Sequence, residues 1–148
     1  MDVDRNGLEI LDRRECLELL QTVQLGRLAV TSSALPSIVP VNFRVADDLI
    51  VVRTGRGTKL DAATRNAVVA FEADDIDPTD HTGWSVVITG VARRVSNAAE
   101  LSALPQPLRW APGPGGCTIA ISTDVVSGRR ITPAMAKAIR EGTKVLSP

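Results

Sequence analysis

Residues 50–66 read IVVRTGRGTKLDAATRN, and this stretch decides how the rest of the chain is interpreted. It begins as a β-branched apolar run, breaks at Gly55 and Gly57, and continues as a polar segment compatible with a helix. This order predicts a strand, a tight turn and the first turns of a helix. A helix N-terminus presents unpaired N–H groups, so such a turn is suited to bind an anion.

Cationic and hydroxyl side chains are concentrated in the same turn: Arg53, Thr54, Arg56, Thr58 and Lys59. Guanidinium, ammonium and hydroxyl donors suit a phosphate, and glycines let the backbone approach a ligand closely. The spacing matches neither the P-loop nor the three-glycine dinucleotide fingerprint. We therefore expect the turn to hold the phosphate of a cofactor, with a solvated basic surface loop as the alternative interpretation.

The composition excludes several classes of function. The chain has 148 residues, enough for one domain, and its 17 Lys and Arg balance 17 Asp and Glu. A zero net charge argues against broad binding to nucleic acid or an anionic membrane. Two cysteines and one histidine give no metal-ligand spacing and no Ser-His-Asp relay. With no long apolar run and an acidic, polar N-terminus, we expect a cytoplasmic protein without a metal site.

Periodicity and turn residues predict a mainly β chain with peripheral helices. Residues 1–10 are expected to form a loose arm, 11–141 a single domain and 142–148 a tail. Pro40 lies inside a predicted strand and places that part of the strand at an edge or next to a bulge, and Gly90 suggests a bend. The expected strands are 26–31, 37–44, 50–53, 67–73, 83–95 and 117–121, with a further short one at 125–131. The expected helices are 12–23, one that follows the turn and is capped by Asn66, 97–103 and 132–140.

Several of these segments, taken in order over residues 11–131, resemble one known family. They are Leu25-Gly26-Arg27-Leu28-Ala29, Val39-Pro40-Val41-Asn42-Phe43, Arg53–Lys59, Gly83-Trp84-Ser85-Val86 and Gly90. The set is similar to the pyridoxamine 5′-phosphate oxidase-related proteins, the FMN-binding split β-barrels. The nearest sub-group includes nitroimidazole-reductase-like and small actinobacterial-type members. The resemblance implies a six-stranded antiparallel split β-barrel and a homodimer with cofactor sites between subunits.

The resemblance also implies which residues bind FMN. Thr54 and Lys59 match the family's phosphate ligands, whereas Arg53 stands where the family has Tyr and Thr58 where it has Arg. The isoalloxazine ring would lie along Val39, Pro40, Val41 and Asn42, and Trp84 and Ser85 match a polar pair near the flavin. Arg109 and Trp110 are the candidates for lining the cleft between subunits. A lid packed on the barrel is the alternative role for Trp110.

The activity implied by the resemblance is a flavin-dependent oxidation or reduction of an unidentified small substrate. A deazaflavin coenzyme could replace FMN. No side chain stands out as a dedicated acid or base, so no catalytic residue is assigned. The Arg-rich C-terminal element that grips pyridoxamine phosphate is not found, and that substrate is not expected. The alternatives are a non-catalytic module that binds flavin, deazaflavin or haem, and a barrel without a cofactor.

Overall fold

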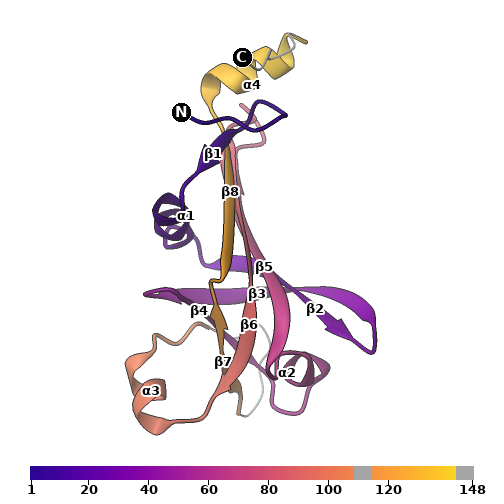
Figure 1. Cartoon of the computed structure of the whole chain (residues 1–148), viewed down its shortest axis with the longest axis vertical. Helices are drawn as coiled ribbons and strands as arrows, with labels where there is room; N and C mark the ends of the chain where they lie inside the picture. Colours follow the sequence, from indigo (N-terminus) through magenta and orange to yellow (C-terminus); the bar gives the residue numbers. More distant parts are fainter. Residues whose placement is uncertain (109–114, 143–148) are drawn as a thin grey trace.

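Six antiparallel strands close into a barrel in the computed structural model, which describes residues 1–108 and 115–142 (Figure 1). The strands follow one another around the ring in the order β6-β5-β2-β3-β4-β7, and β7 pairs with β6 to close it. Their bounds are β2 (Leu25–Ser32), β3 (Leu35–Ala46), β4 (Leu49–Thr54), β5 (Ala67–Ile76), β6 (Gly83–Val95) and β7 (Cys117–Ser122). The predicted six-stranded antiparallel split barrel is confirmed.

Strand β6 changes one of its partners along its length. Its residues Gly83–Thr89 pair with β8 (Val125–Ile131), and Ala92–Val95 pair with β7. Gly90 lies between the two pairings, where a Cβ would stand 1.7 Å from the carbonyl oxygen of Ser122. A glycine is therefore required at this position by the close approach of β7. Above the barrel, β8, β6 and β5 continue as a tall extension (Figure 1).

The barrel interior is filled mainly by aliphatic side chains. Phe43 and Phe71 are both buried and meet edge to face, with ring centroids 4.7 Å apart. Along β6 the buried side chains alternate with accessible ones, as the period of a half-buried strand requires. Trp84, Val86, Ile88 and Ala92 are on the buried face, as the sequence predicts.

In the part of the chain that the structure describes, four short helices surround the strands: α1 (Arg13–Leu20), α2 (Lys59–Ala63), α3 (Ala98–Ala103) and α4 (Pro133–Arg140). Asp12 and Glu15 form the expected capping box of α1, which ends three residues earlier than predicted. Helix α2 ends at Ala63, and Asn66 has the expected left-handed backbone with a φ of 52°. Within the described residues, no helix combines the length and apolar character needed to cross a bilayer.

The N-terminal segment differs from the expected loose arm at Glu9 and Ile10. These residues lie in strand β1 (Glu9–Leu11), which pairs with β8 and adds an eighth strand to the sheet. An ion pair fixes the preceding turn, since the Nε of Arg129 donates to the Asp4 carboxylate at 2.8 Å. Short-range periodicity could not reveal this pairing because its partners lie about 120 residues away in sequence.

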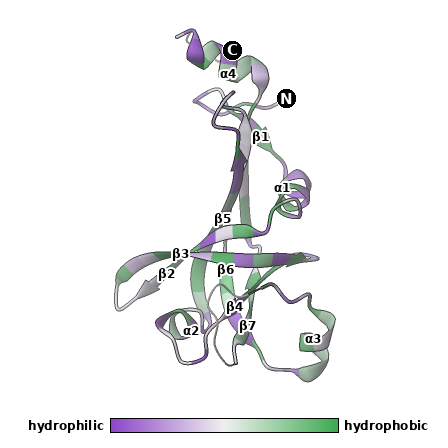
Figure 2. Cartoon of the chain, turned by 180° about the vertical axis from the view of Figure 1, so that it is seen from behind, coloured by the Kyte–Doolittle hydropathy of each residue, from purple (hydrophilic) through white to green (hydrophobic). Residues whose placement is uncertain are grey.

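The prediction that Pro40 lies at an edge is confirmed. Residues 35–42 of β3 pair with β2 alone, and β4 joins β3 only from Phe43 to Ala46. Pro40, which has no N–H to donate, stands opposite Arg27 in this singly paired half. The β2–β3 hairpin projects from the side of the barrel, and hydrophobic residues lie along it (Figure 2).

Candidate functional site

The turn between β4 and α2 is shaped by hydrogen bonds among its own residues. The hydroxyl of Thr58 caps α2, accepting from the N–H of Asp61 at 3.1 Å and donating to the carbonyl of Gly55 at 2.8 Å. Gly57 has a φ of +74°, a left-handed conformation that favours glycine. The hydroxyl of Thr58 therefore helps to form the turn. We call residues 53–59 the cationic turn.

Asp61 holds the cationic turn against α2, and its role was missed in the sequence. Its buried carboxylate accepts from the N–H of Gly57 at 2.8 Å and from the guanidinium of Arg65 at 3.2 Å. The Gly57 N–H, then the charges of Arg65 and Arg94, lower the pKa of Asp61 from its ordinary value. The spacing of Thr58 and Asp61, a hydroxyl followed three residues later by an acid, is the capping signature that could have identified it.

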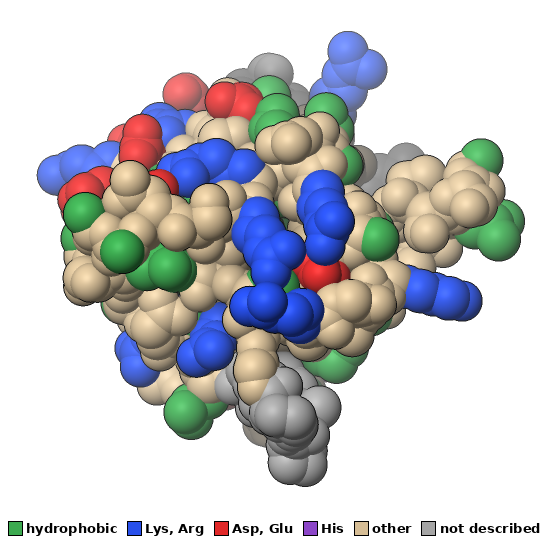
Figure 3. All heavy atoms as spheres, turned by 90° about the horizontal axis from the view of Figure 1, so that it is seen from below, with side chains coloured by type: hydrophobic (Ala, Val, Ile, Leu, Met, Phe, Trp, Pro, Cys, Tyr) green, Lys and Arg blue, Asp and Glu red, His purple; other side chains and the backbone are tan. Residues whose placement is uncertain are grey.

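Two buried polar groups at the end of β4 have no hydrogen-bond partner among the residues that the structure describes: the Nε of Arg53 and the Oγ1 of Thr54. Thr54 is only 2% exposed. Arg56 and Lys59, both exposed, make no hydrogen bond or ion pair with any residue that the structure describes. Figure 3 shows Lys and Arg side chains gathered over this end of the barrel. Because buried polar groups are nearly always hydrogen-bonded, the vacant donors of Arg53 and Thr54 fit an anionic ligand such as a phosphate.

The expected ring-binding segment lies on the strand beside the cationic turn. Phe43 pairs with Val52, so Asn42 and Arg53 are the next residues beyond this pair on their two strands. The segment alternates, with Val41 buried and Val39 partly buried, while Pro40 is exposed and Asn42 half-buried. The structure thus brings Asn42 and Pro40 to the side of the barrel next to Arg53.

Trp84 and Ser85 lie far from the cationic turn within one chain. They stand at the start of β6, opposite Arg130 and Arg129 of β8, whereas the end of β6 that reaches β7 near the turn is at Arg94 and Val95. Ten residues of strand separate Trp84 from Arg94, a span of about 33 Å at 3.3 Å per residue. A single chain therefore does not bring the two parts together. The remaining candidates, Arg109 and Trp110, lie outside the described residues.

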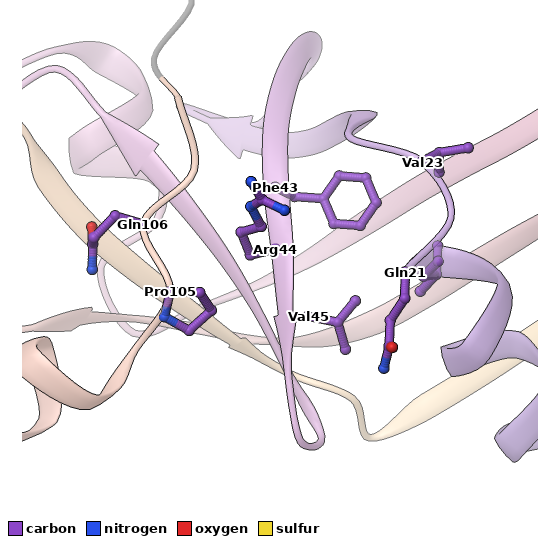
Figure 4. A pocket seen from close by; sticks show the side chains of 8 residues that line it. Gln21, Val23, Phe43, Arg44, Val45, Pro105 and Gln106 are labelled. Atoms are coloured by element: carbon purple, nitrogen blue, oxygen red, sulfur yellow. The ribbon is translucent and has the colours of Figure 1, made fainter.

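A cavity of about 530 Å³ opens beside the next residues of β3, Phe43, Arg44 and Val45. Phe43 and Val45 point toward α1 and the residues that follow it, while Arg44 lies on the other side of the strand, the side of Pro105, as strand alternation requires (Figure 4). Gln106, on the segment after α3, accepts a hydrogen bond from Thr118 of β7 at 3.1 Å. The cavity lies between the barrel wall, α1 and the segment after α3, and its lining residue Arg44 is two positions beyond Asn42 on β3.

A charged cluster lies on the outer face of β2 and β5. The Nη1 of Arg27 is 3.4 Å from the Glu72 carboxylate and 3.5 Å from that of Asp74. Burial, and then the neighbouring Asp74, raises the pKa of Glu72 to about 7. A cleft of about 240 Å³ adjoins this cluster and is lined by apolar residues that include Ile38 and Ala70.

Comparison with known proteins decides the family. The family model described as pyridoxamine 5′-phosphate oxidase matches residues 12–137, which include the barrel, the cationic turn and β3. The chain belongs to the pyridoxamine 5′-phosphate oxidase family. Its membership confirms the resemblance seen in the sequence.

Relatives of this family member are found among actinobacterial proteins. The uncharacterized protein Rv0080 of Mycobacterium tuberculosis is 41% identical over 127 residues, which cover 82% of this chain and 84% of the relative. The solved FAD-binding protein of Mycobacterium smegmatis is 35% identical, with a TM-score of 0.68 over 84% of this chain and 99% of that one. A Corynebacterium glutamicum structure, provisionally assigned to the same family, is 36% identical, with a TM-score of 0.73 over 84% and 98% of the two chains.

Proposed function

We propose that this chain binds a flavin nucleotide by its phosphate at the cationic turn and acts as an oxidoreductase on a small substrate. The observation that carries the proposal is the pair of buried, unpartnered groups, the Arg53 Nε and the Thr54 Oγ1, beside the unpaired cations of Arg56 and Lys59. A phosphate would accept from Arg53, Thr54 and Lys59. The FAD-binding relative from Mycobacterium smegmatis supports a flavin as the group that carries this phosphate. The family resemblance implies FMN, with a deazaflavin coenzyme as the alternative.

The residues of this chain have separate roles in the proposed site. A bound flavin would supply hydride or electron transfer, which side chains alone do not provide. Arg53 and Lys59 would balance the phosphate charge, and Thr54 would donate its hydroxyl hydrogen. The Asn42 amide, on the strand next to Arg53, offers both a donor and an acceptor to the polar edge of the ring. Pro40 would present an apolar surface to the ring. Helix α2 has only five residues, so side chains rather than the helix N-terminus would provide most of the attraction for the phosphate.

We further propose that two copies of this chain form a homodimer through the outer face of β3, β2, β5, β6 and β8. The strand registers place a set of exposed aliphatic side chains on this one face. Exposed apolar sheet faces of this kind are typical of protein interfaces. A dimer is also the arrangement in which Trp84 and Ser85 could reach a cofactor site, because within one chain they lie at the far end of β6. The exposed residues are Ile38 (72%), Val68 (68%), Val125 (60%), Val87 (42%) and Val91 (42%).

An absorbance spectrum and size-exclusion chromatography with light scattering test both proposals. The purified protein is measured alone, then with FMN, FAD and a deazaflavin coenzyme. We expect a flavin spectrum that co-elutes with a species of twice the 15.7 kDa chain mass. A protein that binds no flavin would contradict the first proposal, and a flavin-bound monomer would contradict the second. Reduction of the bound flavin by a nicotinamide donor then separates an oxidoreductase from a storage or sensing module.

A further inference from the structure

A second cavity, of about 360 Å³, opens next to the cationic turn. Its walls come from four parts of the chain: the turn itself, the end of β6, helix α3 and the start of β7. The side chains that matter here are Arg56, Arg94, Ser96, Leu101 and Thr118. This volume lies within the range of small-molecule sites and is separate from the larger cavity beside α1.

Among the residues that the structure describes, the two arginines of this cavity form no ion pair, unlike their neighbours. Arg93 forms an ion pair with Glu100, and Arg65 forms one with Asp61. Arg56 and Arg94 form no ion pair or hydrogen bond with residues 1–108 or 115–142. The charge of Arg94 does reach the turn, because it contributes to lowering the pKa of Asp61. Two guanidinium groups on one cavity favour an anion with several oxygens, such as a phosphate.

The cavity is continuous with the proposed phosphate site through the β4–β7 ladder. Thr118 pairs with Arg53, and Cys117 pairs with Thr54, so both β7 residues that line the cavity are direct neighbours of the residues with vacant donors. Arg53, Thr54 and Lys59 suffice for one phosphate group with two negative charges. Arg56 and Arg94 supply two further charges, which a mononucleotide leaves unused.

We infer that the flavin bound by this chain is a dinucleotide with a diphosphate bridge, and that Arg56 and Arg94 bind its second phosphate. The adenosine enters the 360 Å³ cavity, with Leu101 of α3 as an apolar wall and Ser96 as a hydroxyl partner. This inference rests on the proposed function and names the cofactor of the same site as FAD. It departs from the FMN that the family resemblance implies.

Dissociation constants for FMN and FAD, measured on the full chain by quenching of flavin fluorescence, test the inference. We expect wild-type protein to bind FAD about tenfold or more tightly than FMN, because a second phosphate gains charge-assisted contacts. Arg56→Gln combined with Arg94→Gln should raise the dissociation constant of FAD by about tenfold or more and change that of FMN by no more than about twofold. ADP should displace FAD from the wild-type chain. The control is Arg14→Gln, whose side chain is 81% exposed on α1 and should change neither constant.

The outcomes separate this inference from the function on which it rests. Retained FMN binding by the double variant shows that it is folded. The dinucleotide site would be overturned if the double variant lost affinity for FMN and FAD equally. It would also be overturned if the wild-type chain bound FMN at least as tightly as FAD. Either result would leave flavin binding in place. If neither FMN nor FAD bound the wild-type chain, both the dinucleotide site and the proposed flavin-binding function would be overturned.

Discussion

Glu72 and Asp74 lie on the same face of β5 and share one guanidinium, with Arg27 Nη1 3.4 Å from Glu72 and 3.5 Å from Asp74. Burial and the second carboxyl raise the pKa of Glu72 from an ordinary 4.5 to about 7. A carboxyl with a raised pKa binds its proton more tightly in the folded chain than in the unfolded one. The protonated Glu72 therefore stabilises the folded state fully below pH 4.5. This stabilisation is lost as the pH rises through about 7.

Glu72→Gln should remove this pH dependence. Between pH 5 and 8 the free energy of unfolding of the wild type should fall relative to that of the variant by on the order of 1 kcal/mol, since solvent reaches part of the carboxyl. Urea unfolding of both proteins at several pH values measures the difference. Asp124→Asn, an exposed acid on the loop between β7 and β8, is the control. A constant difference across this range would show that Glu72 titrates normally.

Thr54→Val tests the vacant hydroxyl at the end of β4. Valine has nearly the shape of threonine, and it removes a buried oxygen that has no partner in the structure. We expect the free energy of unfolding of the apo chain to stay equal or rise by up to about 1 kcal/mol, while flavin binding weakens. Chemical denaturation and a flavin titration measure the two effects. A clear loss of apo stability would mean that the hydroxyl is hydrogen-bonded within the chain.

Arg53→Ala and Lys59→Ala together should affect binding far more than folding. Charge-assisted contacts to phosphate contribute about 1.5–3 kcal/mol each, so the double variant should lose about a hundredfold or more in flavin affinity. Isothermal titration of flavin into each protein gives the change, and Arg14→Ala on α1 is the matched control. Wild-type affinity in the double variant would rule out the cationic turn as the phosphate site.

Asp61→Asn should loosen the cationic turn itself. The carboxylate is fully buried and accepts from both Gly57 and Arg65, so we expect a loss of about 2–3 kcal/mol in the free energy of unfolding at pH 7. Its pKa lies below the ordinary 3.8, so the stabilisation is present above that pH and disappears as the pH falls through the folded value. Denaturation at pH 7 and near pH 3 should show the gap between the two proteins closing in acid. A gap of the same size at both values would assign Asp61 a role independent of its charge.

Gly90→Ala should destabilise the closure of the barrel. A Cβ at this position would stand 1.7 Å from the Ser122 carbonyl oxygen, so β6 and β7 must separate locally. We expect a loss of about 3 kcal/mol or more, at the high end for single substitutions. Thermal unfolding measures it, with Val91→Ala, an exposed neighbour on β6, as the control. A variant as stable as the wild type would show that the two strands can part at little cost.

Local sequence signals predicted most of the barrel. The bounds of β6 and α3 and the N-caps Asp12, Asn97 and Thr132 agree with the structure, because alternation and capping depend on residues close in sequence. Strand β1 was missed because three residues carry too little periodicity, and its stability comes from pairing with β8. The proline in β3 predicted an open edge correctly, since the missing N–H is a property of the residue itself.

The candidate site was only partly accessible from the sequence. The cationic turn is contiguous, so its composition indicated a phosphate site directly. Asp61 was overlooked although Thr58 lies three residues before it, and Arg94 was overlooked because only the barrel closure brings β6 to the turn. The distance between Trp84 and the cationic turn could not be predicted either. The sequence gives the length of β6 but does not show which of its ends lies beside the turn.

The two prolines in the singly paired half of β3 have a consequence for the behaviour of the chain in concentrated solution. Residues 35–42 offer an open strand edge on an apolar hairpin, which is the usual starting point for strand addition and aggregation. Pro36 and Pro40 remove two of the N–H donors that an incoming strand would need in this segment. Contact between molecules is thereby directed away from the edge and toward the face of the sheet, where association can end at a defined number of copies.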